Sequence, residues 1–274
     1  MVRPTAILLA QRNNGMTEVE PAAATPITMI PRTVTTAAAV APVVVVQFPD
    51  LWGRNVSPFG LKLEAWLRLA DIPYTVEPST NLGKAPKGKL PYIRDDARLI
   101  GDTTLIIEHL KSTRGIDPDA GLNEREYAEA LMLQRLLEDH FYFALVYSRW
   151  IDEAGWSTLY PAFFGRLPFP VGQVAAGHFR RRVSRMLYLQ GMGRHRPSEI
   201  YAMARHDLQA LADYLGDRPF LMGEQLTTID AVAYAFLANV LYVPFETELK
   251  RLTQSFPTLV TYCEAMEQGL QPED

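Results

Sequence analysis

A serine followed by a proline, Ser57-Pro58, stands where a short apolar run gives way to an amphipathic segment. A serine in this place is usually a helix N-cap, and a proline at the first helical position loses no hydrogen bond. The start of a helix also presents unpaired N–H groups and positive potential. We therefore predict that Ser57 caps a helix and that an anion held beside its hydroxyl would be stabilised.

The segments on either side of Ser57 would position this hydroxyl. Residues 43–48 are four valines followed by glutamine and phenylalanine, which predicts a buried strand. In the following helix, intervals of four, four and three residues place on one apolar stripe Phe59, Leu63, Leu67 and Ala70. Lys62, Glu64 and Arg68 lie off that stripe. The chemistry is thus expected at a strand-to-helix junction.

Further short segments complete a first folded unit. Residues 74–76 read as a second strand, so that strand, helix and strand form a βαβ unit with parallel strands. Residues 90–93 and 98–100 read as an antiparallel hairpin around an acidic turn. Thr103 is expected to cap a helix over residues 104–111.

This order of elements, with three motifs in it, resembles the thioredoxin-like N-terminal domain of glutathione transferases over residues 43–111. The motifs are a Ser-Pro helix start, a Lys-Leu-Pro strand entry and an Asp-Thr helix start. The form Ser-Pro-Phe-Gly-Leu-Lys-Leu-Glu is most similar to the subgroup that contains the metaxins and the failed axon connections proteins.

The resemblance implies a set of roles. The residue matching Ser57 contacts the sulfur of glutathione. Leu90, ahead of an expected cis-Pro91, pairs its backbone with the cysteinyl part, and Asp102 and Thr103 hold the γ-glutamyl end. Glutathione is then a co-substrate, the other substrate is a small hydrophobic electrophile, and a homodimer is implied.

Two departures from the family pattern bear on the chemistry. Ser57 and Gly60 stand where thiol-dependent relatives carry the cysteines of a redox pair, which argues against reductase chemistry through an enzyme thiol. Asp102 and Thr103 replace the commoner Glu-Ser pair, which keeps a carboxylate and a hydroxyl at shorter reach. A serine hydroxyl is far too weak a base to deprotonate a thiol, so Ser57 would donate a hydrogen bond to the thiolate.

The rest of the chain predicts an all-helical unit over residues 123–274, reached through a Gly/Pro-containing linker at residues 112–122. The fold class is therefore α/β plus all-α, a thioredoxin-like domain followed by a helical domain like that of glutathione transferases. Helices are expected over residues 124–150, 173–189, 198–215 and 231–241. Residues 151–172 are expected to form a loop, whose aromatic side chains line a pocket or pack on the long helix. Thr227 and Asp230 have capping-box spacing, which resembles the same family and assigns them to folding.

Composition excludes several classes of function. The 27 basic and 31 acidic residues predict no general attraction to nucleic acid or anionic membranes, and no stretch reaches the roughly twenty apolar residues of a membrane span. The single cysteine, Cys263, and the unpaired spacing of the five histidines disfavour a disulfide or a metal site. Residues 1–42 are expected to be a disordered leader or to precede the true start, for which Met16 and Met29 are candidates. We expect a cytoplasmic protein.

Two other functions stay open at this point. A non-catalytic module that binds partners is favoured by the resemblance to metaxins, which act in mitochondrial outer-membrane import. A glutathione-dependent lyase or peroxidase would use the same scaffold, and fold alone does not separate the three. Ser57 beside an acceptable set of glutathione-binding residues favours the transferase.

Overall fold

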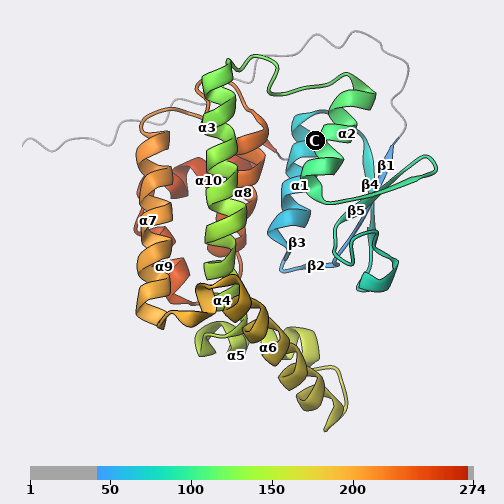
Figure 1. Cartoon of the computed structure of the whole chain (residues 1–274), viewed down its shortest axis with the longest axis vertical. Coiled ribbons are helices and arrows are strands. Elements are labelled where there is room, and N and C mark those ends of the chain that lie inside the picture. Colours follow the sequence, from blue (N-terminus) through green and yellow to red (C-terminus); the bar gives the residue numbers. More distant parts are fainter. Residues whose placement is uncertain (1–41, 271–274) are drawn as a thin grey trace, which may run out of the picture. The chain divides into compact units, whose positions relative to one another are not determined.

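The computed structural model describes residues 42–270, in which a sheet with covering helices is followed by a helical part (Figure 1). The predicted leader falls almost entirely outside the described residues. The first part contains β1 Val43–Gln47, β2 Asp50–Leu51, β3 Arg54–Asn55, α1 Pro58–Leu69, β4 Tyr74–Pro78, the short η1 Leu82–Lys84, β5 Tyr92–Asp95, β6 Arg98–Gly101 and α2 Thr103–Arg114.

The main sheet has the order β4-β1-β5-β6, with β1 parallel to β4 and β5 antiparallel to both of its neighbours. This confirms the predicted βαβ unit and the predicted hairpin. The register pairs Val46 with Tyr92, and Tyr92 with Gly101. Since these residues lie at the end of β1, the start of β5 and the end of β6, the segments that flank them meet at one end of the sheet.

Helix α1 is buried on nearly all sides. Leu63 and Leu67 of the predicted stripe are fully buried, as the periodicity requires. Lys62 and Glu64 lie off the stripe and are buried as well: Lys62 contacts Thr103 and Glu138, and Glu64 contacts Gln47 and Tyr74. Helix α8 (Thr228–Leu241) also packs against α1. Figure 1 shows α1 and α2 on the side of the sheet that faces the helical part. Helix α1 is thus the element through which the two parts pack together.

The helical part is built from nine further segments. They are α3 Glu124–Arg135, the π-helical η2 Leu136–Phe141, α4 Tyr142–Trp150, α5 Glu153–Phe164, α6 Val171–Gln190, the short η3 Met192–Arg194, α7 Pro197–Leu215, α9 Glu248–Gln254 and α10 Pro257–Gly269, with α8 between α7 and α9. Almost every residue of α8 is buried, and the predicted capping box is confirmed: the Thr227 backbone N–H donates to the Asp230 carboxylate at 2.9 Å. None of the described helices carries an apolar stretch long enough to cross a bilayer.

Two local predictions are wrong. The loop expected over residues 151–172 is helical in α5, because Gly155 is a close contact with α4 and not a break: a Cβ there would lie 2.0 Å from the Ser148 carbonyl oxygen. Two aromatic side chains of this segment, Trp156 and Phe163, pack on Trp150 with ring centroids 6.5 and 5.6 Å away. The N-cap of α2 is Asp102 and not Thr103, and α2 continues to Arg114, into the segment expected as a linker.

Candidate functional site

Ser57 caps α1 as predicted, but its hydroxyl is only loosely engaged. Its oxygen accepts from the Gly60 N–H at 3.5 Å, a distance too long for a strong hydrogen bond, and its proton has no acceptor among residues 42–270. The Ser57 backbone N–H donates to Asn55 Oδ1 at 3.0 Å. Gly60 permits this arrangement, because a Cβ there would lie 2.4 Å from the same Asn55 oxygen. The half-buried hydroxyl is therefore free to donate to a ligand at the start of the helix.

The loop that leads into Ser57 is held by residues of the helical part. Arg149 on α4 donates through Nη1 to the Val56 carbonyl oxygen at 2.7 Å and through Nη2 to Oδ1 of Asn239 on α8 at 2.9 Å. The amide of Asn239 in turn donates to the Asn55 carbonyl oxygen at 3.3 Å. Neither residue was identified from the sequence, where each is one polar residue in a long helix.

Arg149 also brings a positive charge to this loop. Burial lowers the pKa of the Arg149 guanidinium to about 10, so it remains charged at neutral pH. No carboxylate within the described residues forms an ion pair with it. The cation is therefore not neutralised locally, and its field adds to the positive potential of the α1 N-terminus beside Ser57.

The second predicted feature, Leu90-Pro91, lies at the same end of the sheet as the loop after β1. The peptide bond between the two residues is cis, as expected. Both side chains are buried, and among the described residues no hydrogen bond engages the Leu90 backbone. Those backbone groups are thus available to an extended peptide, which is the use that the sequence predicts for them.

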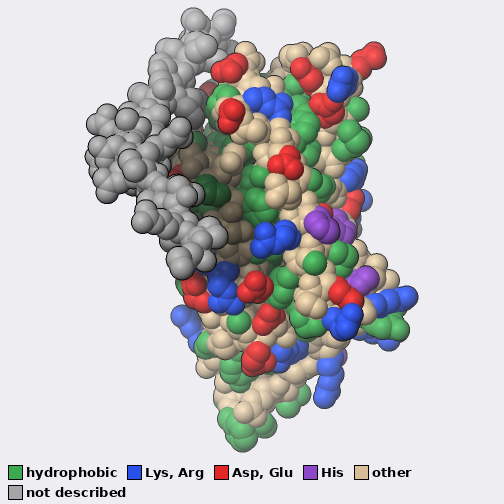
Figure 2. Space-filling model, turned by 90° about the vertical axis from the view of Figure 1, so that its left-hand side faces the viewer, with side chains coloured by type: hydrophobic (Ala, Val, Ile, Leu, Met, Phe, Trp, Pro, Cys, Tyr) green, Lys and Arg blue, Asp and Glu red, His purple; other side chains and the backbone are tan. Residues whose placement is uncertain are grey.

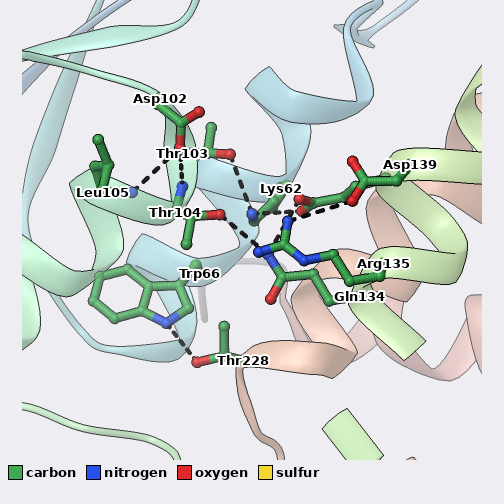
Figure 3. A network of polar contacts seen from close by, with 11 residues as sticks. Lys62, Trp66, Asp102, Thr103, Thr104, Leu105, Gln134, Arg135, Asp139 and Thr228 are labelled. Atoms are coloured by element: carbon green, nitrogen blue, oxygen red, sulfur yellow. Dashed lines mark hydrogen bonds and ion pairs between the residues drawn. The ribbon is translucent and has the colours of Figure 1, made fainter. Parts of the chain in front are cut away.

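The third predicted feature divides into two residues with different surroundings. Asp102 is exposed, and its Oδ1 accepts from the N–H groups of Thr104 and Leu105 at 3.0 and 3.3 Å. Thr103 is buried, and its hydroxyl accepts from the Lys62 ammonium group at 3.1 Å (Figure 3). The Asp102 carboxylate is therefore accessible to a cationic group of a ligand, whereas the Thr103 hydroxyl is occupied by a buried hydrogen bond.

Lys62 is the centre of a buried polar network that sequence reasoning missed. Its ammonium group donates to Glu138 Oε1 at 2.6 Å, and the Lys62 side chain is 1% exposed. The Gln134 amide donates to Glu138 Oε2 and to the Thr104 hydroxyl, both at 3.1 Å. Figure 3 shows these groups between α1, the start of α2 and the helix that carries Gln134. The network fixes the start of α2, and hence Asp102, against the helical part.

A cavity of about 50 Å³ opens beside this network, lined by polar groups that include Lys62, Thr104 and Gln134. It is too small for a tripeptide, and none of the five predicted site residues lines it. Within residues 42–270, no cluster of histidine, cysteine and acidic side chains is arranged to hold a metal ion. The candidate site therefore stays the one predicted from the sequence, at the end of the sheet that Leu90, Pro91 and Asp102 flank and at the start of α1, where Ser57 lies.

The single cysteine is expected to be unreactive, because its thiol is buried. Cys263 on α10 is fully buried, and burial raises the pKa of its thiol to about 12. We expect an aromatic disulfide reagent at pH 8 to label it very slowly in the native protein, since about one molecule in ten thousand carries the thiolate. Labelling should become stoichiometric in urea, where the thiol pKa returns to about 8.5. The unfolded state also loses this proton first, so Cys263 should make stability fall between about pH 8.5 and 12. Rapid labelling of the native protein at pH 8 would contradict the burial.

Comparison with protein families gives two matches. Residues 58–155 match the family described as glutathione S-transferase N-terminal domain, and residues 204–266 match the family described as glutathione S-transferase, C-terminal domain. Residues 156–203, which include most of α5, all of α6 and the start of α7, fall outside both matches.

Sequence comparison with individual proteins also finds glutathione transferases and their relatives. The chain is 34% identical over 229 residues to an isoprene-epoxide glutathione S-transferase of Rhodococcus sp. (strain AD45), covering 81% of this chain and 96% of that protein. It is 27% identical to the failed axon connections protein of Drosophila melanogaster, over 80% of this chain and 55% of that protein. It is 25% identical to human metaxin-2, over 76% of this chain and 80% of that protein. The predicted similarity to both groups is confirmed.

A solved structure supports the fold. A glutathione transferase from Phanerochaete chrysosporium superimposes with a TM-score of 0.58, covering 86% of this chain and 99% of that one. The sequence identity is only 14%, so this likeness shows the fold alone. It agrees with the predicted class, a thioredoxin-like sheet followed by an all-helical part.

Proposed function

Because the chain belongs to the glutathione S-transferase family, we propose that it transfers glutathione to a small hydrophobic electrophile. The observation that supports this most is the Ser57 hydroxyl, whose proton has no acceptor within the described residues and which caps α1. Leu90 and Asp102, the residues proposed to hold the tripeptide, flank strand ends at the same end of the sheet. We take Ser57 as the residue that stabilises the glutathione thiolate.

The energetics of this role are sufficient. Lowering a thiol pKa of ~8.5 by about two units requires roughly 2.7 kcal/mol. One hydrogen bond to a charged sulfur contributes about 1.5–3 kcal/mol, and a helix N-terminus about 0.3–1 kcal/mol. The buried cation of Arg149 acts in the same direction. No general base on the protein is then needed, because the thiol proton leaves to solvent.

The other proposed contacts follow from where each group lies. The backbone of Leu90, next to cis-Pro91, would pair with the cysteinyl part of glutathione. The exposed Asp102 carboxylate would bind the γ-glutamyl ammonium group. Thr103 would contribute through its hydrogen bond to Lys62, which fixes the start of α2, and not by touching the ligand.

We propose an epoxide as the first class of electrophile to test, because the isoprene-epoxide enzyme shares 34% identity over nearly its whole length. The thiolate sulfur would attack one ring carbon, the carbon–oxygen bond would break, and the resulting alkoxide would take a proton from solvent. Phe59 lies two residues after Ser57, and its ring is 5.0 Å from that of Tyr142 on α4. These aromatic side chains would form the apolar wall against which the electrophile lies.

The direct experiment is to incubate the purified chain with glutathione and a small aliphatic epoxide and to follow the glutathione adduct by mass spectrometry. S-methylglutathione, which has no thiol, is the matched control. Enzyme-dependent adduct formation supports the proposal. If glutathione binds in calorimetry but no adduct forms with an epoxide or with an aromatic halide, the transferase assignment is wrong.

Asp102 allows a sharper test of glutathione recognition. We expect Asp102→Asn to raise the KM for glutathione about tenfold, because the change removes one charge that pairs with the ligand ammonium group. Asparagine caps helices as well as aspartate does, so the thermal midpoint should stay unchanged. Asp96→Asn, in the exposed turn between β5 and β6, is the matched control and should leave KM as it is. An unchanged KM in Asp102→Asn would remove this residue from the binding site.

A second function is favoured by the similarity to metaxin-2 and to the failed axon connections protein. In that case the chain would be a binding module without transferase activity. The adduct assay separates the two, because a binding module of this kind forms no glutathione adduct, whether or not it binds glutathione.

A further inference from the structure

The hairpin formed by α5 and α6 has an apolar tip. Phe169 in the connection between the two helices and Val174 in the first turn of α6 are 82% and 68% exposed, more than any other large hydrophobic side chain described. Leu167 and Val171 beside them are exposed as well. Figure 1 shows this hairpin extending past the ends of α4 and α9, and Figure 2 shows hydrophobic side chains at the same lower end of the molecule. Scattered exposed apolar residues are ordinary, but a contiguous group at the end of a projection is not.

Apart from Glu153 at the start of α5, this hairpin carries no acidic residue. Residues 154–198 contain seven arginines and no aspartate or glutamate, in a chain whose net charge is −4. Three of the arginines are engaged: Arg180 with Glu153, Arg194 with the Tyr188 carbonyl, and Arg196 with Glu199. The other four are exposed and form no ion pair with another described residue: Arg166, Arg181, Arg182 and Arg185.

The apolar and the cationic residues share one face. Six residues of α6 are spaced at intervals of three and four and therefore lie on a single side of the helix: Val171, Val174, His178, Arg181, Arg182 and Arg185. All of these residues are exposed, whereas Ala176, Val183 and Leu187 are buried on the opposite side. The exposed face therefore runs from the apolar tip to a cluster of unpaired guanidinium groups. We call this surface the hairpin face.

We propose that the hairpin face binds an anionic phospholipid bilayer, with the apolar tip entering the headgroup region and the arginines contacting lipid phosphates. Apolar side chains at an end and cations behind them fit the two layers that a protein meets on approaching such a membrane. The prevailing negative charge of the rest of the chain would hold that part away from the surface and orient the molecule.

Other occupants fit this face less well. A second copy of the hairpin face would bring unpaired arginines against unpaired arginines, which is unfavourable. A nucleic acid would satisfy the arginines, but Phe169 and Val174 would find no apolar partner along a phosphate backbone. The inference is independent of the proposed chemistry, since none of these residues belongs to the candidate site and the segment lies outside both family matches.

The test is a flotation assay of the full chain with vesicles of phosphatidylcholine alone and with vesicles that also contain phosphatidylglycerol. We expect binding only to the anionic vesicles, weakening as salt is added. Arg181→Gln/Arg182→Gln/Arg185→Gln should lower the partition coefficient about a hundredfold, because each cation near an anionic surface contributes about a fivefold factor. Phe169→Ser/Val174→Ser should lower it as well, at unchanged charge.

Matched controls on another exposed helix are Arg125→Gln for charge and Met132→Ser for apolar area, both on α3. These should bind vesicles as the unaltered chain does, and every variant should keep its circular dichroism spectrum. Equal binding to neutral and anionic vesicles, or undiminished binding by the arginine variant, would overturn the proposal. So would arginine-dependent binding to RNA or self-association in place of vesicle binding.

Discussion

Replacing Ser57 by alanine is expected to reduce kcat/KM for glutathione conjugation about 10- to 100-fold at pH 6.5, with little change in the KM for the electrophile. The reason is the loss of one hydrogen bond to the thiolate, about 1.5–3 kcal/mol, which corresponds to a rise of one to two units in the pKa of bound glutathione. The pH–rate profile measures this directly. Its midpoint should move from about 6.5 toward 8 in Ser57→Ala, so that the variant recovers much of its rate in alkaline buffer.

The control must separate this effect from the loss of a helix cap. Asn123→Ala removes the N-cap of α3, whose side chain accepts from Arg125 and Glu126, at a position outside the candidate site. It should lower stability by about 1 kcal/mol and leave the pH–rate midpoint unchanged. Ser57→Ala should be at least as stable as Asn123→Ala, because the hydrogen bond that it removes, between Ser57 and Gly60, is long. A pH profile that does not move in Ser57→Ala would exclude Ser57 from thiolate stabilisation.

The largest effect on stability is expected from Lys62. Lys62→Met should lower the free energy of unfolding by about 3–5 kcal/mol, because it leaves the Glu138 carboxylate buried without a cation. Urea denaturation followed by circular dichroism measures the change. Lys62→Met/Glu138→Leu should be more stable than the single variant, since replacing both partners removes the uncompensated charge.

A neighbouring pair provides the comparison. Arg135 and Asp139 form an ion pair at 3.5 Å one turn away, with side chains 54% and 63% exposed. Arg135→Met should leave the urea midpoint nearly unchanged, because solvent screens such a pair. If Lys62→Met behaves like Arg135→Met, the Lys62–Glu138 contact does not contribute to stability.

The features that the sequence predicts correctly are those that depend on neighbours along the chain. The Ser57 cap, the stripe through Leu63 and Leu67, and the capping box at Thr227 follow from spacings of three and four residues. The parallel pairing of β1 with β4 and the hairpin of β5 and β6 follow from a βαβ unit and from a tight acidic turn, both local rules. The pairing of β1 with β5, which brings the end of β1 and the end of β6 to one end of the sheet, does not follow from these rules.

The features that the sequence does not reveal depend on partners far apart in it. Lys62 contacts Glu138, which is 76 residues away in the sequence, and Arg149 contacts Val56, which is 93 residues away. In the sequence a buried lysine on a helix cannot be told from an exposed one. Gly155 was misleading for a related reason: it reads as a helix breaker, whereas its lack of a Cβ allows α5 to approach α4.

The contacts of Arg149 and Asn239 with the carbonyl oxygens of Val56 and Asn55 carry a consequence for protein engineering. The proposed catalytic residue, Ser57, lies in the part that contains the sheet. The backbone just before it is held in place by two side chains from the helical part. A chimera that joins residues 43–111 to the helical domain of another protein would contain Ser57 but not the side chains that position the backbone before it. Such a chimera also needs an arginine and an asparagine at the positions equivalent to Arg149 and Asn239.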